Sequence, residues 1–140
     1  MKLDFPLLST CDPTSCSGGK IMLCDRLIEN VYRKHLSTFN ITNSQFVILM
    51  VLAKTGGISQ VEISNKLSLE KSSVSRNIRR LIATNLAQKS TGKKIEITLS
   101  GKKLMEGLIP AWEAAKAEVN TILGEDGQKA LNLLIQKLKS

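Results

Sequence analysis

The chain has 140 residues, which is long enough for one domain with its own hydrophobic core. One Trp, one Tyr and three Phe are too few for a surface on which single-stranded bases stack, and no apolar run approaches the roughly 20 residues that cross a bilayer. The net charge of +8 favours an acidic partner such as a nucleic acid.

The first 19 residues contain many Ser, Thr, Pro and Gly residues and predict a flexible N-terminal arm. This arm lacks the apolar core of a signal peptide, so no export is expected. Cys11, Cys16 and Cys24 are therefore expected to be reduced thiols in a soluble, cytoplasmic protein that binds no membrane.

Two helices are predicted after the arm. From about residue 20 to residue 37, apolar residues recur at the spacing of one helix face. Thr42 and Gln45 then have the spacing of a capping box, which predicts a second helix over residues 43–54. This second helix is nearly all apolar and should be buried, and a Gly-Gly pair at residues 56–57 should end it.

A short helix, a tight turn and a longer helix are predicted next, followed by a β-hairpin. Ser59 and Glu62 form another capping box, so a short helix should run to about residue 67 and a longer one over residues 71–84. Residues 86–89 and 94–99 flank a Ser-Thr-Gly turn, and residues 94–99 alternate polar and apolar side chains, which predicts the hairpin. This order is typical of a helix-turn-helix motif with a wing.

Two C-terminal helices complete the predicted fold. Ser100 should cap a helix that reaches about residue 123 and bends near Gly107 or Pro110, and a last helix is expected over residues 126–139. The predicted fold class is therefore mainly α with a small β-hairpin wing, a winged helix-turn-helix flanked by N- and C-terminal helices.

The basic residues are concentrated in residues 71–103, which we call the basic window. It contains nine Lys and Arg residues and one acid, Glu96, whereas the 11 bases and 11 acids of the rest of the chain balance. In its helix Val74, Ile78 and Leu81 recur at the spacing of one face and should point to the core, which leaves the basic residues outside. Positive charge on an exposed helix and hairpin indicates binding to double-stranded DNA.

The predicted DNA contacts fall on this helix and on the hairpin. The residues expected to contact base edges lie at the start of the helix: Ser72, Ser73, Ser75 and Arg76. The residues expected to hold backbone phosphates lie farther along the helix and on the hairpin: Arg79, Arg80, Lys89, Lys93 and Lys94. Asn77 could face either side. The alternative is a solvated basic surface, or a winged-helix module that binds an acidic protein.

The order of these elements resembles the MarR family of winged-helix transcriptional regulators, from about residue 20 onward. The resemblance is carried by residues 41–46 (ITNSQF), 58–63 (ISQVEI), 69–76 (LEKSSVSR), 98–101 (TLSG) and 108–110 (LIP). The hairpin departs from the family pattern, because its tip at residues 90–93 is short and contains no arginine, whereas family wings place the arginine of an Asp-x-Arg motif in the minor groove. We therefore expect the wing to add affinity more than specificity.

The resemblance implies a homodimer that represses transcription from a pseudo-palindromic operator. Residues 20–140 would form one regulator domain, with a DNA-binding lobe at about residues 42–99 and dimerisation helices at residues 20–37 and 100–139. The amphipathic patterns of the terminal helices agree, because these helices hold more apolar surface than one compact core needs. Twofold symmetry would place the half-sites about 10 base pairs apart.

The resemblance also implies regulation by a small aromatic ligand or by an oxidant. In relatives such ligands act in a crevice between the dimerisation helices and the DNA-binding lobe. Here the walls of that crevice would include Tyr32, Phe46 and Trp112.

The cysteines allow an alternative function as a redox switch. Some relatives sense peroxide through a cysteine near the first helix, a role that Cys24 could take with Cys11 and Cys16 upstream; otherwise Cys24 is a buried, inert residue. No metal site is expected, because His35 is the only histidine and the cysteines lack the paired spacing of zinc sites. No catalytic triad or Gly-rich phosphate loop stands out, so neither an enzyme nor a cofactor is expected.

Overall fold

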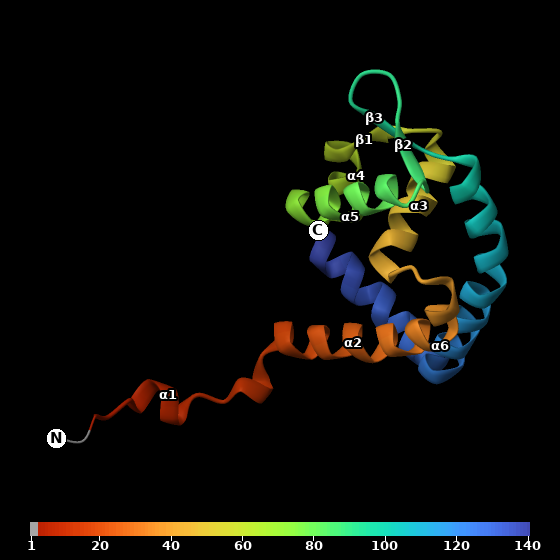
Figure 1. Cartoon of the computed structure of the whole chain (residues 1–140). Helices are drawn as coiled ribbons and strands as arrows, with labels where there is room; N and C mark the ends of the chain where they lie inside the picture. Colours follow the sequence, from red (N-terminus) through yellow and green to blue (C-terminus); the bar gives the residue numbers. More distant parts are fainter. Residues whose placement is uncertain (1–2) are drawn as a thin grey trace.

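The computed structural model describes residues 3–140. Figure 1 shows a winged-helix lobe with one long helix below it, a second long helix running down its side, and the N-terminal arm extending away from it. The elements follow in this order: α1 (Pro6–Thr10), η1 (Pro13–Ser15), α2 (Ser17–Leu36), η2 (Ser37–Phe39), α3 (Asn43–Thr55), β1 (Ile58–Ser59), α4 (Gln60–Leu67), α5 (Lys71–Ala83), β2 (Ala87–Lys89), β3 (Lys94–Ile97) and α6 (Leu99–Lys139). A mainly helical chain with a small hairpin confirms the predicted fold class.

The predicted arm contains two short helices, α1 and η1, and its described residues are all exposed. Thr10 Oγ1 donates to the Pro6 carbonyl oxygen (2.7 Å) within α1, and Asp12 caps η1 by accepting a hydrogen bond from Thr14 N (3.0 Å). Residues 1 and 2 of the arm lie outside the described residues. The helix α2 begins at Ser17, earlier than the predicted residue 20.

The helix α3 begins with the capping box that its sequence predicts. Thr42 Oγ1 accepts a hydrogen bond from Gln45 N, and Gln45 Oε1 accepts one from Thr42 N, both at 3.2 Å. The helix ends at Gly56, whose φ of +74° is a conformation that glycine adopts without strain. Ile48 and Leu49 are fully buried, so α3 forms the centre of the core, as predicted.

The helices α4 and α5 form the predicted helix-turn-helix, with α5 packed against both α3 and α4. Ser59 and Glu62 form the expected capping box at the start of α4. In α5 the side chains of Val74, Ile78 and Leu81 are at most 1% exposed, which confirms their predicted inward face.

A three-stranded antiparallel sheet with strand order β1-β3-β2 forms the wing and its base. The predicted hairpin of β2 and β3 is present, with Ala87 opposite Ile97. The strand β1 was not predicted, and it pairs Ile58 with Ile95 of β3. This pairing ties the hairpin to the start of α4, because α4 follows β1 directly.

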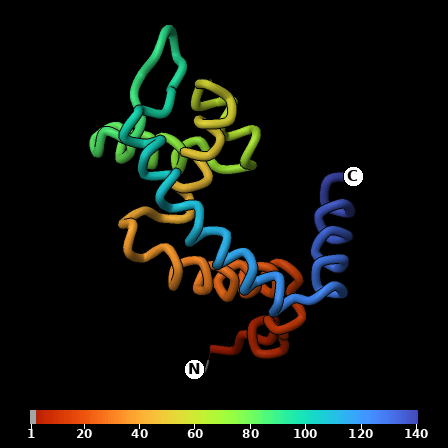
Figure 2. Tube along the Cα trace, turned by 90° about the vertical axis from the view of Figure 1, so that its right-hand side faces the viewer, coloured from red at the N-terminus to blue at the C-terminus, as the bar shows by residue number. Residues whose placement is uncertain are grey.

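The helix α6 differs from the prediction at its start and at its bend. Thr98, and not Ser100, is the N-cap, because Thr98 Oγ1 accepts a hydrogen bond from Gly101 N (3.0 Å). The backbone stays helical through Gly107 and Pro110, and the break lies at Gly124, with φ +66° and ψ −176°. After Gly124 the chain turns back toward the lobe, so the expected last helix is present as a separate segment (Figure 1, Figure 2).

Among residues 3–140 no single helix is long and apolar enough to cross a membrane. Two helices, Ser17–Phe39 and Asn43–Thr55, reach that length and composition only as a pair bent by 74°. The second of them is the central core helix α3, and core helices of this kind have the same composition.

Candidate nucleic-acid interface

The outer face of α5, which we call the recognition helix, is polar and basic. Its exposed side chains are Lys71, Ser72, Arg76, Arg79 and Arg80, and Ser73 and Ser75 are partly buried beside them. Asn77 faces inward, where its Nδ2 donates to the Ser73 carbonyl oxygen (3.1 Å). The buried face fixes the helix on the core and leaves the arginines free to meet a partner.

The start of the recognition helix has free backbone donors. Glu70 is the N-cap residue and makes no side-chain hydrogen bond to the first turn of α5. The first amide groups of a helix have no partner within the helix, so the amides of this turn can bond to a phosphate or a base. Ser72 and Ser73 lie in the same turn and add hydroxyl donors.

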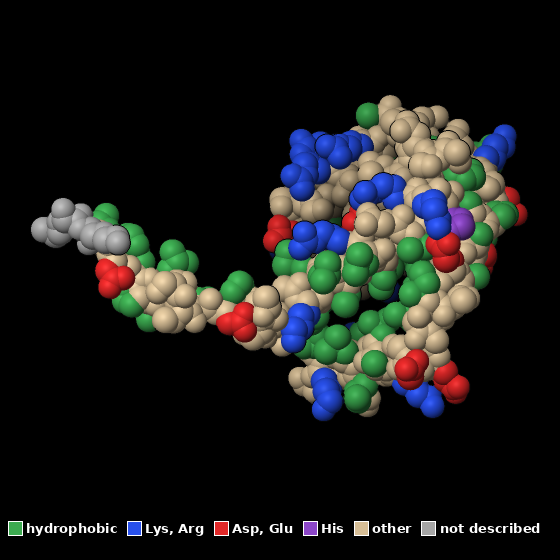
Figure 3. Space-filling view, turned by 90° about the horizontal axis from the view of Figure 1, so that it is seen from below, with side chains coloured by type: hydrophobic (Ala, Val, Ile, Leu, Met, Phe, Trp, Pro, Cys, Tyr) green, Lys and Arg blue, Asp and Glu red, His purple; other side chains and the backbone are tan. Residues whose placement is uncertain are grey.

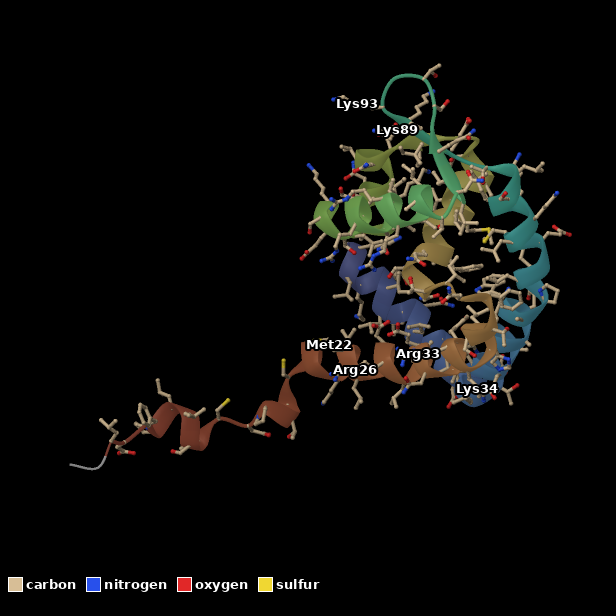
Figure 4. All side chains as sticks on the ribbon, viewed as in Figure 1. Met22, Arg26, Arg33, Lys34, Lys89 and Lys93 are labelled. Atoms are coloured by element: carbon tan, nitrogen blue, oxygen red, sulfur yellow. The ribbon has the colours of Figure 1, made fainter. Side chains whose placement is uncertain are left out.

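The wing adds three exposed lysines beside the start of α4. Lys89, Lys93 and Lys94 line a groove of about 390 Å³ together with residues 59–61. Ser90 N donates to the Lys94 carbonyl oxygen (2.8 Å), which closes the tip of the hairpin. Figure 4 shows Lys89 and Lys93 projecting outward from the hairpin. The wing therefore presents a row of ammonium groups to solvent.

The bases of the basic window have no ion-pair partner in the described part of the chain. None of the ion pairs found among residues 3–140 involves a base of the window. Its one acid, Glu96, accepts a hydrogen bond from Gln88 Nε2 (2.7 Å) on the neighbouring strand. A concentrated and unpaired positive charge attracts a polyanion strongly at low salt.

A second exposed surface lies on α2 and α6 and is apolar. The large exposed apolar residues of this surface, which we call the apolar face, are Ile21, Met22, Leu23 and Leu27 of α2 and Ile122, Leu131, Leu134, Ile135 and Leu138 of α6. Figure 3 views the molecule from below and shows hydrophobic side chains gathered there. Between the two helices lies an apolar groove of about 360 Å³, lined by residues that include Cys24, Val31 and Val119.

An ion cluster holds the same two helices together. Lys34 Nζ of α2 lies 2.6 Å from Glu118 Oε1 of α6, and the neighbouring His35 Nε2 lies 3.4 Å from Glu118 Oε2. The hydrogen bond from Lys34 is the main cause that lowers the pKa of Glu118 below its ordinary value. His35, considered above for a metal site, thus faces a carboxylate of the neighbouring helix.

In the described part of the chain, Tyr32 and Trp112, both expected around a ligand, line different grooves. Phe46 is buried, and its ring lies 5.4 Å from that of Trp112. Trp112 lines a groove of about 550 Å³ between α3 and α6, with charged residues such as Lys54 and Lys102 along it. Tyr32 lines a different groove, and burial, followed by the charge of Glu113, raises its pKa.

The thiols are all accessible. Cys11, Cys16 and Cys24 are free and exposed, so the interpretation of Cys24 as a buried residue is wrong. Within residues 3–140 no cluster of three His, Cys, Asp or Glu residues is placed to hold a metal ion.

A model of the MarR family matches residues 39–94, which run from the end of η2 through α3, the helix-turn-helix and the wing to Lys94. These 56 of the 140 residues match the MarR family. A search of curated protein sequences finds no match.

Solved MarR-like structures share the fold along most of the chain. BpsR of Bordetella bronchiseptica, in a study of how 6-hydroxynicotinic acid regulates its DNA binding, is 21% identical with a TM-score of 0.82, covering 92% of this chain and 97% of its own. MosR of M. tuberculosis is 22% identical with a TM-score of 0.79, covering 89% and 96%. A cysteine-to-serine mutant of E. coli MarR bound to operator DNA is 21% identical with a TM-score of 0.76, covering 86% and 91%.

Proposed function

We propose that this chain is a cytoplasmic, sequence-specific regulator of transcription that binds double-stranded DNA and acts as a repressor. The observation that carries the proposal is the recognition helix. Its buried face fixes it on the core, and its outer face exposes Arg76, Arg79 and Arg80 with no acid paired to them among the described residues. The match of residues 39–94 to the MarR family and the operator complex of the similar E. coli MarR support this assignment.

The proposed contacts divide into two classes. The start of the recognition helix enters the major groove and contacts base edges through Ser72, Ser73, Ser75 and Arg76. The other basic residues hold phosphates: Arg79, Arg80, Lys89, Lys93 and Lys94. Because the short wing has no arginine, it adds affinity for any duplex, and specificity comes from the helix.

We propose that the protein acts as a homodimer paired through its apolar face. Leu131, Leu134, Ile135 and Leu138 form a stripe at helical spacing on a segment whose residues from 129 onward are all exposed. An exposed stripe of this size is typical of a protein interface. Residues 42–99 would then form the DNA-binding lobe, residues 20–37 and 100–139 the dimerisation helices, and residues 1–19 the arm. Such a dimer fits a pseudo-palindromic operator with half-sites about 10 base pairs apart.

A small aromatic effector would bind beside Trp112. The groove there combines an aromatic wall with two lysines, Lys54 and Lys102, and two acids, Glu106 and Glu113, which suit a ligand with a ring and polar substituents. The effect of 6-hydroxynicotinic acid on BpsR is a precedent for this class of ligand. Quenching of Trp112, the single tryptophan, would report binding directly.

Redox control through Cys24 is the second candidate. Its thiol is exposed and lines the groove between α2 and α6, so a modification there would change the apolar face. This alternative expects peroxide to abolish DNA binding and reductant to restore it. Cys24→Ser would then block the effect, whereas Cys11→Ser and Cys16→Ser test the thiols of the arm.

Fluorescence anisotropy tests the proposed function. The reduced protein is titrated onto duplex DNA from upstream of its own gene and onto a scrambled duplex, each at several salt concentrations. A preference for the upstream duplex that survives rising salt supports a sequence-specific regulator. Equal binding to both duplexes that disappears as salt rises would indicate a basic surface without sequence preference. No binding at low salt would favour a winged-helix module that binds an acidic protein.

A further inference from the structure

Thr98 joins the end of the recognition helix to the start of α6. Its Oγ1 donates to the Asn85 carbonyl oxygen (2.7 Å) and accepts from Gly101 N (3.0 Å). Its N–H donates to the Leu86 carbonyl oxygen (3.1 Å). Asn85 and Leu86 follow the recognition helix closely, and Gly101 lies in the first turn of α6. A single side chain in a position only 8% exposed therefore connects the two helices.

The chain on either side of Thr98 is fixed as well. Asn85 has a φ of +61° and donates its N–H to the Ile82 carbonyl oxygen (3.0 Å), and Leu86 N donates to the Leu81 carbonyl oxygen (2.8 Å). Gly101 lies so close to the Leu86 carbonyl oxygen that a Cβ there would collide with it. We call this set of residues, 81–86 and 98–101, the α5–α6 corner.

The corner matters because α6 carries much of the apolar face. In the proposed dimer each α6 lies at the twofold axis. Each recognition helix is connected to its α6 by the corner and by α3, on which both helices pack. The distance between the two recognition helices then depends on the angle between α5 and α6. That distance has to match half-sites about 10 base pairs apart. A looser corner would let the dimer reach other spacings at a lower free-energy cost.

We propose that Thr98 is a positioning residue that makes the dimer selective for one half-site spacing. It acts through the α5–α6 corner and does not touch the DNA. The inference rests on the proposed function, because it requires a dimer that binds two half-sites.

The test measures affinity as a function of half-site spacing. The probes are duplexes that carry two copies of the half-site that the wild-type protein selects from a random pool, moved apart or together in steps of one base pair. We expect the affinity of the wild-type protein to fall by roughly tenfold or more at two base pairs from the best spacing. Thr98→Val keeps the size of the side chain but removes both hydrogen bonds of the hydroxyl. In this variant the affinity at two base pairs from the best spacing should fall by only about threefold or less.

Three further variants separate positioning from folding. Thr98→Ser retains the hydroxyl and should retain the wild-type spacing profile. Thr121→Val makes the same chemical change in α6, where Thr121 Oγ1 donates only to the Ala117 carbonyl oxygen (3.0 Å), and should leave the profile unchanged. Asn85→Ala strains the corner without removing the Thr98 hydroxyl, since alanine disfavours the positive φ, and should broaden the profile even if Thr98→Val fails to fold.

The outcomes are distinct. If the wild-type protein selects no half-site, the proposed function fails before the spacing series begins. If the wild-type protein is selective for spacing and folded Thr98→Val is equally selective, the positioning role is overturned. A loss of affinity that is the same at every spacing also overturns it, because a purely structural defect weakens binding without changing the profile.

Discussion

Lys34 Nζ and Glu118 Oε1 lie 2.6 Å apart, although 84 positions separate the two residues in the chain. Their ion pair joins α2 to α6 at the base of the lobe, where Ala115 and Val119 of α6 are buried. His35 approaches the second carboxylate oxygen at 3.4 Å without forming a well-aligned hydrogen bond. Glu118 is thus the shared acid of a three-residue cluster that orients the two helices.

Acid should weaken the contact between α2 and α6. The pKa of Glu118 in the folded chain is lowered, chiefly by the hydrogen bond from Lys34, from its ordinary value of 4.5. The stability it contributes is therefore complete above about pH 4.5 and is lost as the pH falls through the lowered pKa. Glu118→Gln should reduce this acid-dependent loss of Tm, measured by circular dichroism.

Glu125→Gln is a matched control for that series. Glu125 pairs with Lys129 at 3.7 Å on the surface of the same helix, and pairs exposed in this way contribute little. If Glu118→Gln has the same pH profile as the wild-type protein, the cluster does not contribute to stability.

Arg76→Ala should lose affinity selectively. If the Arg76 guanidinium is bidentate to a guanine, the variant loses about 1–3 kcal/mol on the specific duplex and much less on a scrambled one. Anisotropy titrations on both duplexes measure the difference. Equal losses of affinity on the two duplexes would contradict the assignment of Arg76 to base contact.

Lys93→Ala should weaken binding to every duplex. Lys93 lies at the tip of the wing, where an ammonium group can reach a phosphate but lacks the planar fork of arginine. The expected signature is a similar loss on specific and scrambled DNA, with a slope of log K against log salt reduced by about 1. A loss confined to the specific duplex would instead assign base contact to the wing.

Gly101→Ala should destabilise the fold. A Cβ at Gly101 would collide with the Leu86 carbonyl oxygen and would lie 2.7 Å from Ile97 Cγ1. Overpacking of this kind costs about 1–3 kcal/mol, which urea unfolding measures. Gly107→Ala is the matched control in the same helix, because a Cβ there meets nothing within 4 Å and should stabilise the helix by about 0.5–1 kcal/mol.

Leu134→Glu should break the proposed dimer. Leu134 lies in the exposed stripe of the apolar face, and a carboxylate buried at an interface has a large desolvation cost. Light scattering after size exclusion should show the mass of one chain for Leu134→Glu. It should show the mass of two chains for the wild-type protein. The control Leu99→Glu, which changes an exposed leucine outside the apolar face, should also have the mass of two chains. A dimeric Leu134→Glu would place the interface elsewhere.

Structural elements that depend on residues close together in the sequence could be predicted from it. The capping boxes of α3 and α4 are formed by residues three positions apart, and the inward face of the recognition helix follows from a repeat within the helix. The pattern of the wing also reflects burial of one face of β3, where Ile95 and Ile97 are buried. For these elements the local pattern and the final structure agree.

Features set by distant residues could not be predicted. The strand β1 has two residues, too few for an alternating pattern, and exists because β3 offers it a partner. Thr98 and Ser100 are both suitable N-cap residues by type, and the bond from Thr98 to Asn85, 13 positions away, favours Thr98. The contact of Lys34 with Glu118 likewise depends on how two helices pack.

The DNA contacts were predicted from charge and helix periodicity, whereas the ligand site was predicted from residue type and the family resemblance. Trp112 and Phe46 do contact one another, but Tyr32 lines another groove. An aromatic residue can serve the core as well as a pocket, so residue type alone does not separate the two roles.

The break at Gly124 also affects how the chain folds. By turning the last segment of α6 away from its own helix, it leaves residues 129–139 with every side chain exposed. A helix of this length is only marginally stable in water unless another surface covers it. We therefore expect the helical order of this segment to increase with protein concentration, since association supplies that surface. Newly made chains would complete their last helix only when enough copies had accumulated to meet one another, so the supply of the protein would itself control how much of it is fully folded.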